Sequence, residues 1–136
     1  MMHKSPWIGS LNASGCNGCM LEYLAALSPK YDLDRFGCLV KISARHADVL
    51  LVNGAVNKKM KKPLLEIYAQ MKEPKYVVAV GSCAISGTLF RSSYNFAGPL
   101  DSLVPVSVYI PGCPPRPESI IHGVMKVLKD AEANNP

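Results

Sequence analysis

The sequence predicts an α/β fold with an open, mostly parallel β-sheet covered by helices on both faces. Two nearly unbroken apolar runs, at 49–52 and 76–80, are typical of strands buried on both faces. Helical periodicity follows the first of these runs and recurs elsewhere, and strands that alternate with helices favour right-handed crossovers and parallel pairing. With 136 residues and 49% hydrophobic residues, the chain can bury one ordinary core, so we expect a single domain over residues 1–136.

The first half of the chain is predicted to contain three strands and two helices. Apolar residues at 7–12 form a short first strand, and Met20, Tyr23, Leu24 and Leu27 give a helix that Ser28-Pro29 ends. The remaining elements are an edge strand at 36–42, a buried strand at 49–52 and an amphipathic helix at 58–71. Leu64, Leu65, Ile67, Tyr68 and Met71 are expected on its inner side.

The second half is predicted to contain two strands and one long helix. A buried strand at 76–80 leads into a long loop at 84–104 with at most one helical turn, of the kind that is often functional or contacts a partner. A last strand follows at 106–110, and Pro117 opens a helix with apolar residues through Leu128. We expect a frayed tail at 132–136.

Composition restricts the class of protein without choosing a partner. The net charge of +5 and the pI near 9.0 suit an acidic protein, anionic lipid headgroups or nucleic acid. Four lysines (58, 59, 61 and 62) oppose the dipole at a helix start, and they indicate a solvated face, a docking patch or a lipid contact. No apolar run approaches the roughly 18 to 20 residues that cross a bilayer, and the start lacks a signal peptide. We therefore expect a soluble, cytoplasmic chain.

The cysteine pattern predicts a metal centre. Cys16 and Cys19 lie between the first strand and the first helix, whereas Cys83 and Cys113 each follow a later strand and lie beside or near glycine. Because parallel strands end at one edge of a sheet, four thiolates should converge there. Five cysteines in a chain without an export signal are an improbable disulfide framework.

Spacing favours an iron-sulfur cluster over zinc. Structural zinc sites usually combine two pairs of ligands, each closely spaced in sequence. Here one Cys-x-x-Cys pair is joined by two distant cysteines. A thioredoxin-like redox pair at Cys16 and Cys19 is an alternative, but it leaves the glycine-flanked Cys83 and Cys113 unexplained. Cys38 lies within a strand pattern, so we interpret it as a core residue.

Five ordered blocks resemble one family of proteins. They are Gly-Cys-Asn-Gly-Cys at 15–19 and the segments 31–37, 45–52, 76–83 and 108–117. Together they resemble the small, cluster-bearing subunit of energy-converting membrane-bound [NiFe] hydrogenases, and the homologous 20 kDa-type subunit of respiratory complex I. The resemblance covers roughly residues 6 to 128 and implies a flavodoxin-like, three-layer αβα domain, with the cluster at the carboxyl edge of the strands.

The resemblance implies an electron-transfer subunit of an oxidoreductase complex, without independent catalysis. One [4Fe-4S] cluster would be bound by Cys16, Cys19, Cys83 and Cys113, next to the active site of a large catalytic subunit. A ferredoxin-like iron-sulfur subunit and membrane subunits would complete a complex on the cytoplasmic side of the membrane. The Cys-x-x-Cys form looks like the hydrogenase branch. Met20, which stands where that branch commonly has an acid, leaves open a sulfur (sulfane) reductase or an NADH/quinone-type relative.

Several other residues have two interpretations. Glu22 is either a proton relay or an acid placed favourably in the first helical turn. Arg91 and Arg116 either supply charge beside the cluster or are solvated, and His46 and His122 are expected not to bind metal. The alternative from another class is a zinc-stapled basic module that binds nucleic acid. We expect no nucleic-acid partner, because no recognised binding motif or interleaved aromatic pattern is present.

Overall fold

The computed structural model of the chain describes residues 6–40 and 43–134. All strand pairs in its sheet are parallel, and the strand order is β2-β1-β3-β4-β5. The predicted α/β class with a parallel sheet is therefore confirmed. The strands are β1 (Trp7–Ser14), β2 (Leu39–Val40), β3 (Val49–Gly54), β4 (Tyr76–Val80) and β5 (Val108–Ile110).

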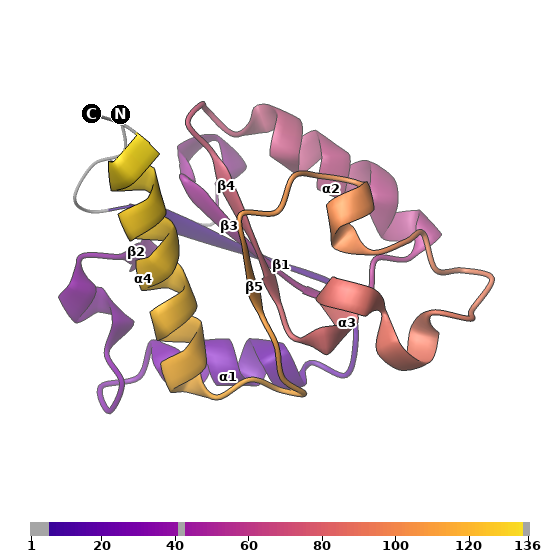
Figure 1. Cartoon of the computed structure of the whole chain (residues 1–136), viewed down its shortest axis with the longest axis horizontal. Helices are drawn as coiled ribbons and strands as arrows, with labels where there is room; N and C mark the ends of the chain where they lie inside the picture. The colour runs from indigo at the N-terminus through magenta and orange to yellow at the C-terminus, as the bar shows by residue number, and fades with distance from the viewer. Residues whose placement is uncertain (1–5, 41–42, 135–136) are drawn as a thin grey trace.

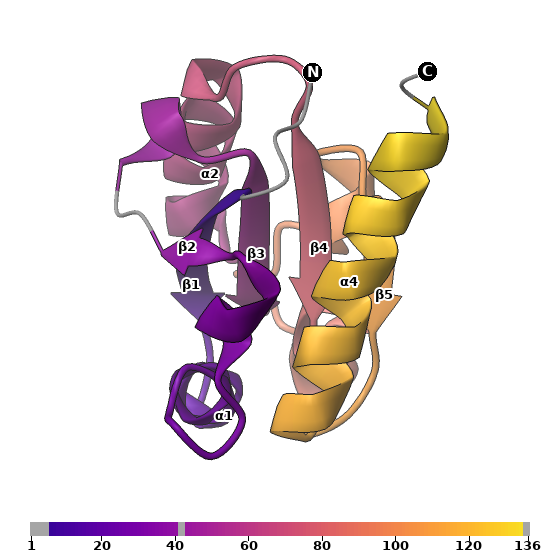
Figure 2. The ribbon, with the colours of Figure 1, turned by 90° about the vertical axis from the view of Figure 1, so that its left-hand side faces the viewer.

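Helices cover both faces of the sheet, which gives the expected three layers (Figures 1 and 2). Helices α1 (Gly18–Ala26) and α4 (Pro117–Asn134) lie on one face, and α2 (Lys58–Gln70) and α3 (Ser82–Ser86) on the other. Along β3, Leu51 faces the first layer while Leu50 and Val52 face the second. This alternation explains the unbroken apolar run, because each residue of the strand meets a covered face.

Several predicted boundaries were wrong by a few residues. The strand expected at 36–42 is reduced to β2, because a 3-10 helix (Leu33–Phe36) precedes it and Gly37 turns the chain with φ 87°; residues 41–42 lie outside the described part. Strand β5 begins at Val108, not at 106. Helix α4 continues to Asn134, so residues 132–134 of the expected frayed tail are helical, and 135–136 are not among the described residues.

The segment predicted as a long loop contains short helices. Helix α3 begins at Ser82, and 3-10 helices follow at Thr88–Phe90 and Leu100–Ser102. These turns are too short to show apolar periodicity in the sequence. Within residues 6–40 and 43–134, no helix has both the length and the apolar character that a membrane span requires.

Two side chains point away from the core positions predicted for them. Leu24 on α1 is 52% exposed and Leu65 on α2 is 38% exposed. Leu64 and Met71 of the expected inner side of α2 are buried, and Ile67, Tyr68 and Met60 pack against the same core. The buried stripe of each helix is therefore narrower than the apolar pattern suggested.

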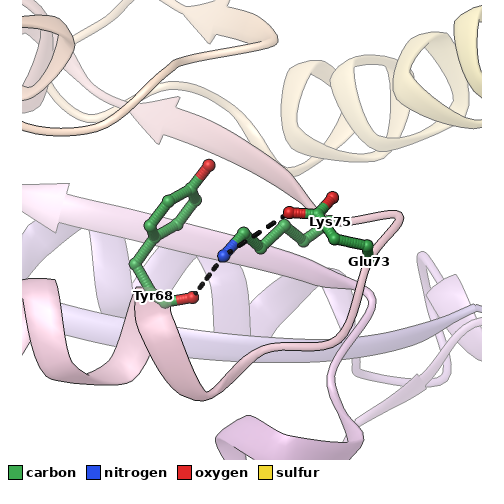
Figure 3. A network of polar contacts seen from close by, with 3 residues as sticks. All are labelled: Tyr68, Glu73 and Lys75. Atoms are coloured by element: carbon green, nitrogen blue, oxygen red, sulfur yellow. Dashed lines mark hydrogen bonds and ion pairs between the residues drawn. The ribbon is translucent and has the colours of Figure 1, made fainter.

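A network of polar contacts stabilises the carboxyl end of α2 (Figure 3). The ammonium of Lys75 donates a hydrogen bond to the backbone oxygen of Tyr68 at 2.9 Å. It also lies 3.7 Å from the Glu73 carboxylate and 3.9 Å from the centroid of the Tyr68 ring. A cation at this end of a helix compensates the negative pole of the dipole.

Candidate metal centre

Three loops at the carboxyl edge of the sheet carry four of the five cysteines. Cys16 and Cys19 lie where β1 leads into α1, Cys83 is the second residue of α3 after β4, and Cys113 follows β5. Because β1, β4 and β5 are parallel members of one sheet, their following loops open at the same edge.

Backbone contacts hold these loops against one another. The amide of Ser82 donates to the Gly112 carbonyl at 2.9 Å, and its hydroxyl donates to the same oxygen at 3.2 Å. The amide of Gly81 donates to the Ile110 carbonyl at 2.8 Å. The loop of Cys83 is thereby fixed to the loop of Cys113.

The loop of Cys16 and Cys19 also approaches the other two loops. A Cβ placed on Gly81 would lie 2.5 Å from the Cys19 sulfur, so the turn after β4 packs directly against that thiol. A Cβ on Gly18 would lie 3.4 Å from the Cys16 sulfur and 3.8 Å from the side chain of Pro114. All three cysteine loops therefore meet at one place.

The thiol of Cys19 lies at the electrostatic centre of this group. Its pKa is raised to about 11, by burial first and then by the charges of three neighbouring thiols, those of Cys83, Cys16 and Cys113. Such effects require the thiols to lie close together, because charge interactions weaken with distance and with solvent screening. Iron would reverse this trend, since a bound metal deprotonates its thiol ligands. The structure therefore brings to one edge of the sheet the loops of the four cysteines that the sequence selected.

The group is open on its outer side. Cys16 and Cys113 are exposed, whereas Cys19 and Cys83 are partly buried. Cys83 also lies 3.5 Å from the hydroxyl of Thr88. Cys38 is buried in the core between α1 and the sheet, as expected, and burial followed by the charge of Asp34 raises its pKa to about 11.

Four cysteines are a donor set that fits an iron-sulfur cluster. Zinc with bonds of about 2.3 Å needs sulfurs only about 3.8 Å apart, whereas a cluster binds each thiolate through a different iron and spreads the sulfurs wider. Within the described ranges, no three His, Cys, Asp or Glu side chains are grouped so that they could hold one metal ion. Four cysteines on three adjoining loops remain a donor set that a cluster can use.

The charged candidates from the sequence have different surroundings. Helix α1 begins at Gly18 and has no acid in its first turn, so the dipole interpretation of Glu22 was wrong. Arg91 and Arg116 are both exposed, and His46 packs its ring 5.8 Å from that of Trp7. Glu22 stays a candidate proton relay because it is half-buried, three positions after Cys19.

One feature beside the centre lies within the segment 84–104, which the sequence predicted to be functional or to contact a partner. Residues 87–97, here called the arm, extend beyond α3 (Figure 1). Leu89 and Tyr94 are each 90% exposed, and Phe90 is 45% exposed. The length of the loop was the signal in the sequence, which does not reveal whether the large apolar side chains of the loop face inward.

The base of the arm is fixed at both ends. The ring of Phe96 packs so tightly on Gly87 that a Cβ there would lie 2.5 Å from it. The amide of Lys58 donates to Asn95 at 2.9 Å, and the amide of Ala97 donates to Val56 at 2.9 Å. The arm is thus an anchored projection with an apolar tip.

Known proteins share long stretches of this sequence. Residues 16–127 match the model of the family described as NADH ubiquinone oxidoreductase, 20 kDa subunit. The chain is 46% identical over 126 residues to a probable membrane-bound hydrogenase subunit of Pyrococcus furiosus, covering 93% of this chain and 75% of the relative. It is 51% identical over 112 residues to a subunit of the NADH-quinone oxidoreductase of Carboxydothermus hydrogenoformans, covering 82% and 68%.

A solved structure shows the same fold. A chain of the membrane-bound sulfane sulfur reductase, an archaeal respiratory membrane complex, superposes with a TM-score of 0.84 at 38% identity. The match covers 97% of the present chain and 73% of the other.

Proposed function

Since this chain belongs to the family of the NADH ubiquinone oxidoreductase 20 kDa subunit, we propose that it is an electron-transfer subunit carrying one [4Fe-4S] cluster. Its relatives are subunits of hydrogenase, quinone oxidoreductase and sulfane sulfur reductase complexes. The cluster would accept one electron from a ferredoxin-like subunit and deliver it to the active site of a large subunit. The complex would lie on the cytoplasmic side of a membrane and include membrane subunits.

The observation that carries this proposal is the convergence of four thiols around Cys19. Cys16, Cys19, Cys83 and Cys113 would bind the cluster, each through one iron. The sulfur of Cys19 is partly buried and the Gly81 backbone packs against it, which supports tuning of the cluster potential by exclusion of solvent.

The composition of the arm supports the proposal that the chain docks to the large subunit through this surface. Leu89, Phe90 and Tyr94 expose apolar surface beside Arg91, and aromatic residues and arginine are enriched at the centres of protein interfaces. The contact between Cys83 and Thr88 links this surface to a proposed ligand. A partner that covers the arm would therefore come close to the cluster, as electron transfer requires.

The acceptor is proposed from the relatives. The Cys-x-x-Cys pair and the Pyrococcus furiosus relative favour a membrane-bound, ion-pumping hydrogenase. The sulfane sulfur reductase chain, with its TM-score of 0.84, favours a sulfur reductase as the second candidate. An NADH/quinone-type oxidoreductase is the third, because the relative from Carboxydothermus hydrogenoformans is 51% identical over the aligned residues.

Replacement of single cysteines tests the cluster. We expect Cys83→Ser and Cys113→Ser to remove or alter the electron paramagnetic resonance signal of the reduced, anaerobically purified chain, together with its iron and acid-labile sulfide. Cys38→Ser is the matched control and should keep both. An unchanged signal in either of the first two variants would contradict the ligand assignment, and zinc without sulfide in the wild type would support the structural zinc module instead.

A further inference from the structure

Four lysines form an exposed basic surface on the first turns of α2. This lysine surface consists of Lys58, Lys59, Lys61 and Lys62, all of them exposed. We propose that it binds the anionic headgroups of membrane phospholipids. The inference deepens the proposed function, on which its placement at a membrane rests, by naming the face of the chain that meets the bilayer.

The lysine surface lacks compensating charge in its own helical turn. The first turn of α2 contains no acidic residue, and lysines there face the positive pole of the helix dipole. The single ion pair found among the described residues joins Lys75 to Glu73, at the opposite end of α2 (Figure 3). Lys75 thus has a carboxylate partner within this chain. Within the described part of the chain, the four lysines at the start of α2 have no such ion pair.

Two hydrogen bonds hold the first turn of α2 in place despite the repulsion among its lysines. The side chain of Asn57 caps the helix by accepting a hydrogen bond from the Met60 amide at 2.8 Å. The amide of Lys58 is bound to Asn95 at the base of the arm. The lysines are therefore displayed on a fixed scaffold, and their mutual repulsion is not relieved by unwinding of the helix.

Apolar surface adjoins the lysines. The outer side of α2 has a shallow depression of about 440 Å³, lined by Lys58, Lys61, Lys62, Leu65, Glu66 and Ala69. Leu65 is 38% exposed there, although sequence periodicity predicted it to be buried. Lysine stems can lie along apolar surface while their ammonium groups reach phosphates, which is the usual arrangement at a membrane interface.

Residue type favours a lipid surface over an acidic protein. Lysine is depleted at protein interfaces, where arginine and aromatic residues are enriched, whereas lysine clusters are a common means of binding anionic lipid. The first turns of α2 and the adjoining depression contain no arginine and no aromatic residue. The arm, with Leu89, Phe90, Arg91 and Tyr94, has the opposite composition. The chain therefore presents two neighbouring surfaces with different chemistry, one suited to protein and the other to lipid.

Vesicle binding tests the inference directly. The purified full chain is mixed at low salt with vesicles of phosphatidylcholine alone, or of phosphatidylcholine with phosphatidylglycerol, and bound protein is separated by flotation. We expect binding only to the anionic vesicles. In the triple variant Lys58→Gln, Lys61→Gln, Lys62→Gln the affinity should fall roughly 100-fold, or about fivefold per lysine. The matched control Lys72→Gln, Lys126→Gln, Lys129→Gln removes the same charge elsewhere and should bind nearly as the wild type does.

Thermal unfolding separates this loss from damage to the fold. Glutamine is a good helix former and relieves the unfavourable dipole interaction, so the α2 triple variant should melt no lower than the wild type. Failure of the wild type to bind anionic vesicles, or equal losses in both triple variants, would overturn the inference. Retention of the wild type on immobilised polyglutamate but not on vesicles would also overturn it and assign the surface to an acidic protein. The paramagnetic signal of the cluster is read on the same samples, so failure here and failure of the proposed function are distinguishable.

Discussion

Gly81 is the residue whose small size most directly permits the cysteine loops to meet. Its backbone adopts φ 84° and ψ 159°, a region that residues with a side chain essentially avoid. Added bulk would also strike the Cys19 sulfur. The sequence identified the cysteines through their spacing, but it did not show which nearby glycine is required by contact.

Replacement of Gly81 by alanine should damage both fold and centre. We expect Gly81→Ala to lower the free energy of unfolding by about 1 to 3 kcal/mol and to reduce iron and sulfide content, because both the backbone strain and the contact with Cys19 are unfavourable. Urea denaturation and metal analysis measure the two effects. Gly15→Ala is the control, since its nearest neighbour would lie at an ordinary 3.4 Å. Equal iron content and stability in both variants would refute this account.

At the scale of single elements, α1 combines an exposed face with one buried polar group. Tyr23 is 3% exposed, and its hydroxyl has no hydrogen-bond partner among the residues that the structure describes. Burial, followed by the charges of Asp34 and Cys38, raises its pKa from 10.0 to about 12. Folding therefore favours the neutral phenol, whose contribution to stability is complete below pH 10 and is lost as the pH rises towards 12.

We expect Tyr23→Phe to remove much of this alkaline instability. At pH 8 the variant should be as stable as the wild type or about 1 kcal/mol more stable, because an unpaired buried hydroxyl is removed. Between pH 10 and 12 the wild type should lose an additional 2 to 3 kcal/mol, as an order of magnitude, that the variant keeps. Urea denaturation of the cluster-free chain at both ends of this range measures the difference. Tyr94→Phe, at a side chain that is 90% exposed, should behave as the wild type does.

The elements that could be predicted from the sequence were those with a strong periodic pattern. The strand at 76–80 was predicted with the bounds that β4 has, because each of its residues meets a covered face of the sheet. Short elements were predicted with the wrong bounds: of the edge strand expected at 36–42, β2 has only two residues, and both Leu39 and Val40 are exposed. Exposure of Leu24 and Leu65 could not be predicted either, since apolar residues on an outer face have the same identity as those in the core.

At the scale of the whole molecule, the parallel sheet gathers distant cysteines at one edge and places the arm beside them. The gathering of the cysteines was predictable, because it follows from strand order and direction alone. The arm was not, because its direction depends on contacts between Gly87 and Phe96 and between Lys58 and Asn95. The second of these contacts joins segments that are far apart along the chain.

Polar substitutions at the tip of the arm should weaken binding to the large subunit without changing the stability of the fold. We expect the double variant Leu89→Ser, Tyr94→Ser to unfold within about 0.5 kcal/mol of the wild type, because both side chains are almost fully exposed. Its affinity for the large subunit should fall at least roughly 30-fold if these residues are interface anchors. Co-purification from cells that express both subunits, followed by titration, measures the loss. Leu65→Ser is the control, and a double variant that assembles as well as this control would refute the docking role.

The open position of Cys16 and Cys113 has a consequence for the life of the subunit before assembly. A cluster held at these thiols would face water on one side, where dioxygen and chelators can reach the inorganic core. A neighbouring subunit that covers this side would then protect the cofactor as well as exchange electrons with it. Cells that make this protein would therefore benefit from inserting the cofactor and recruiting the neighbour in quick succession.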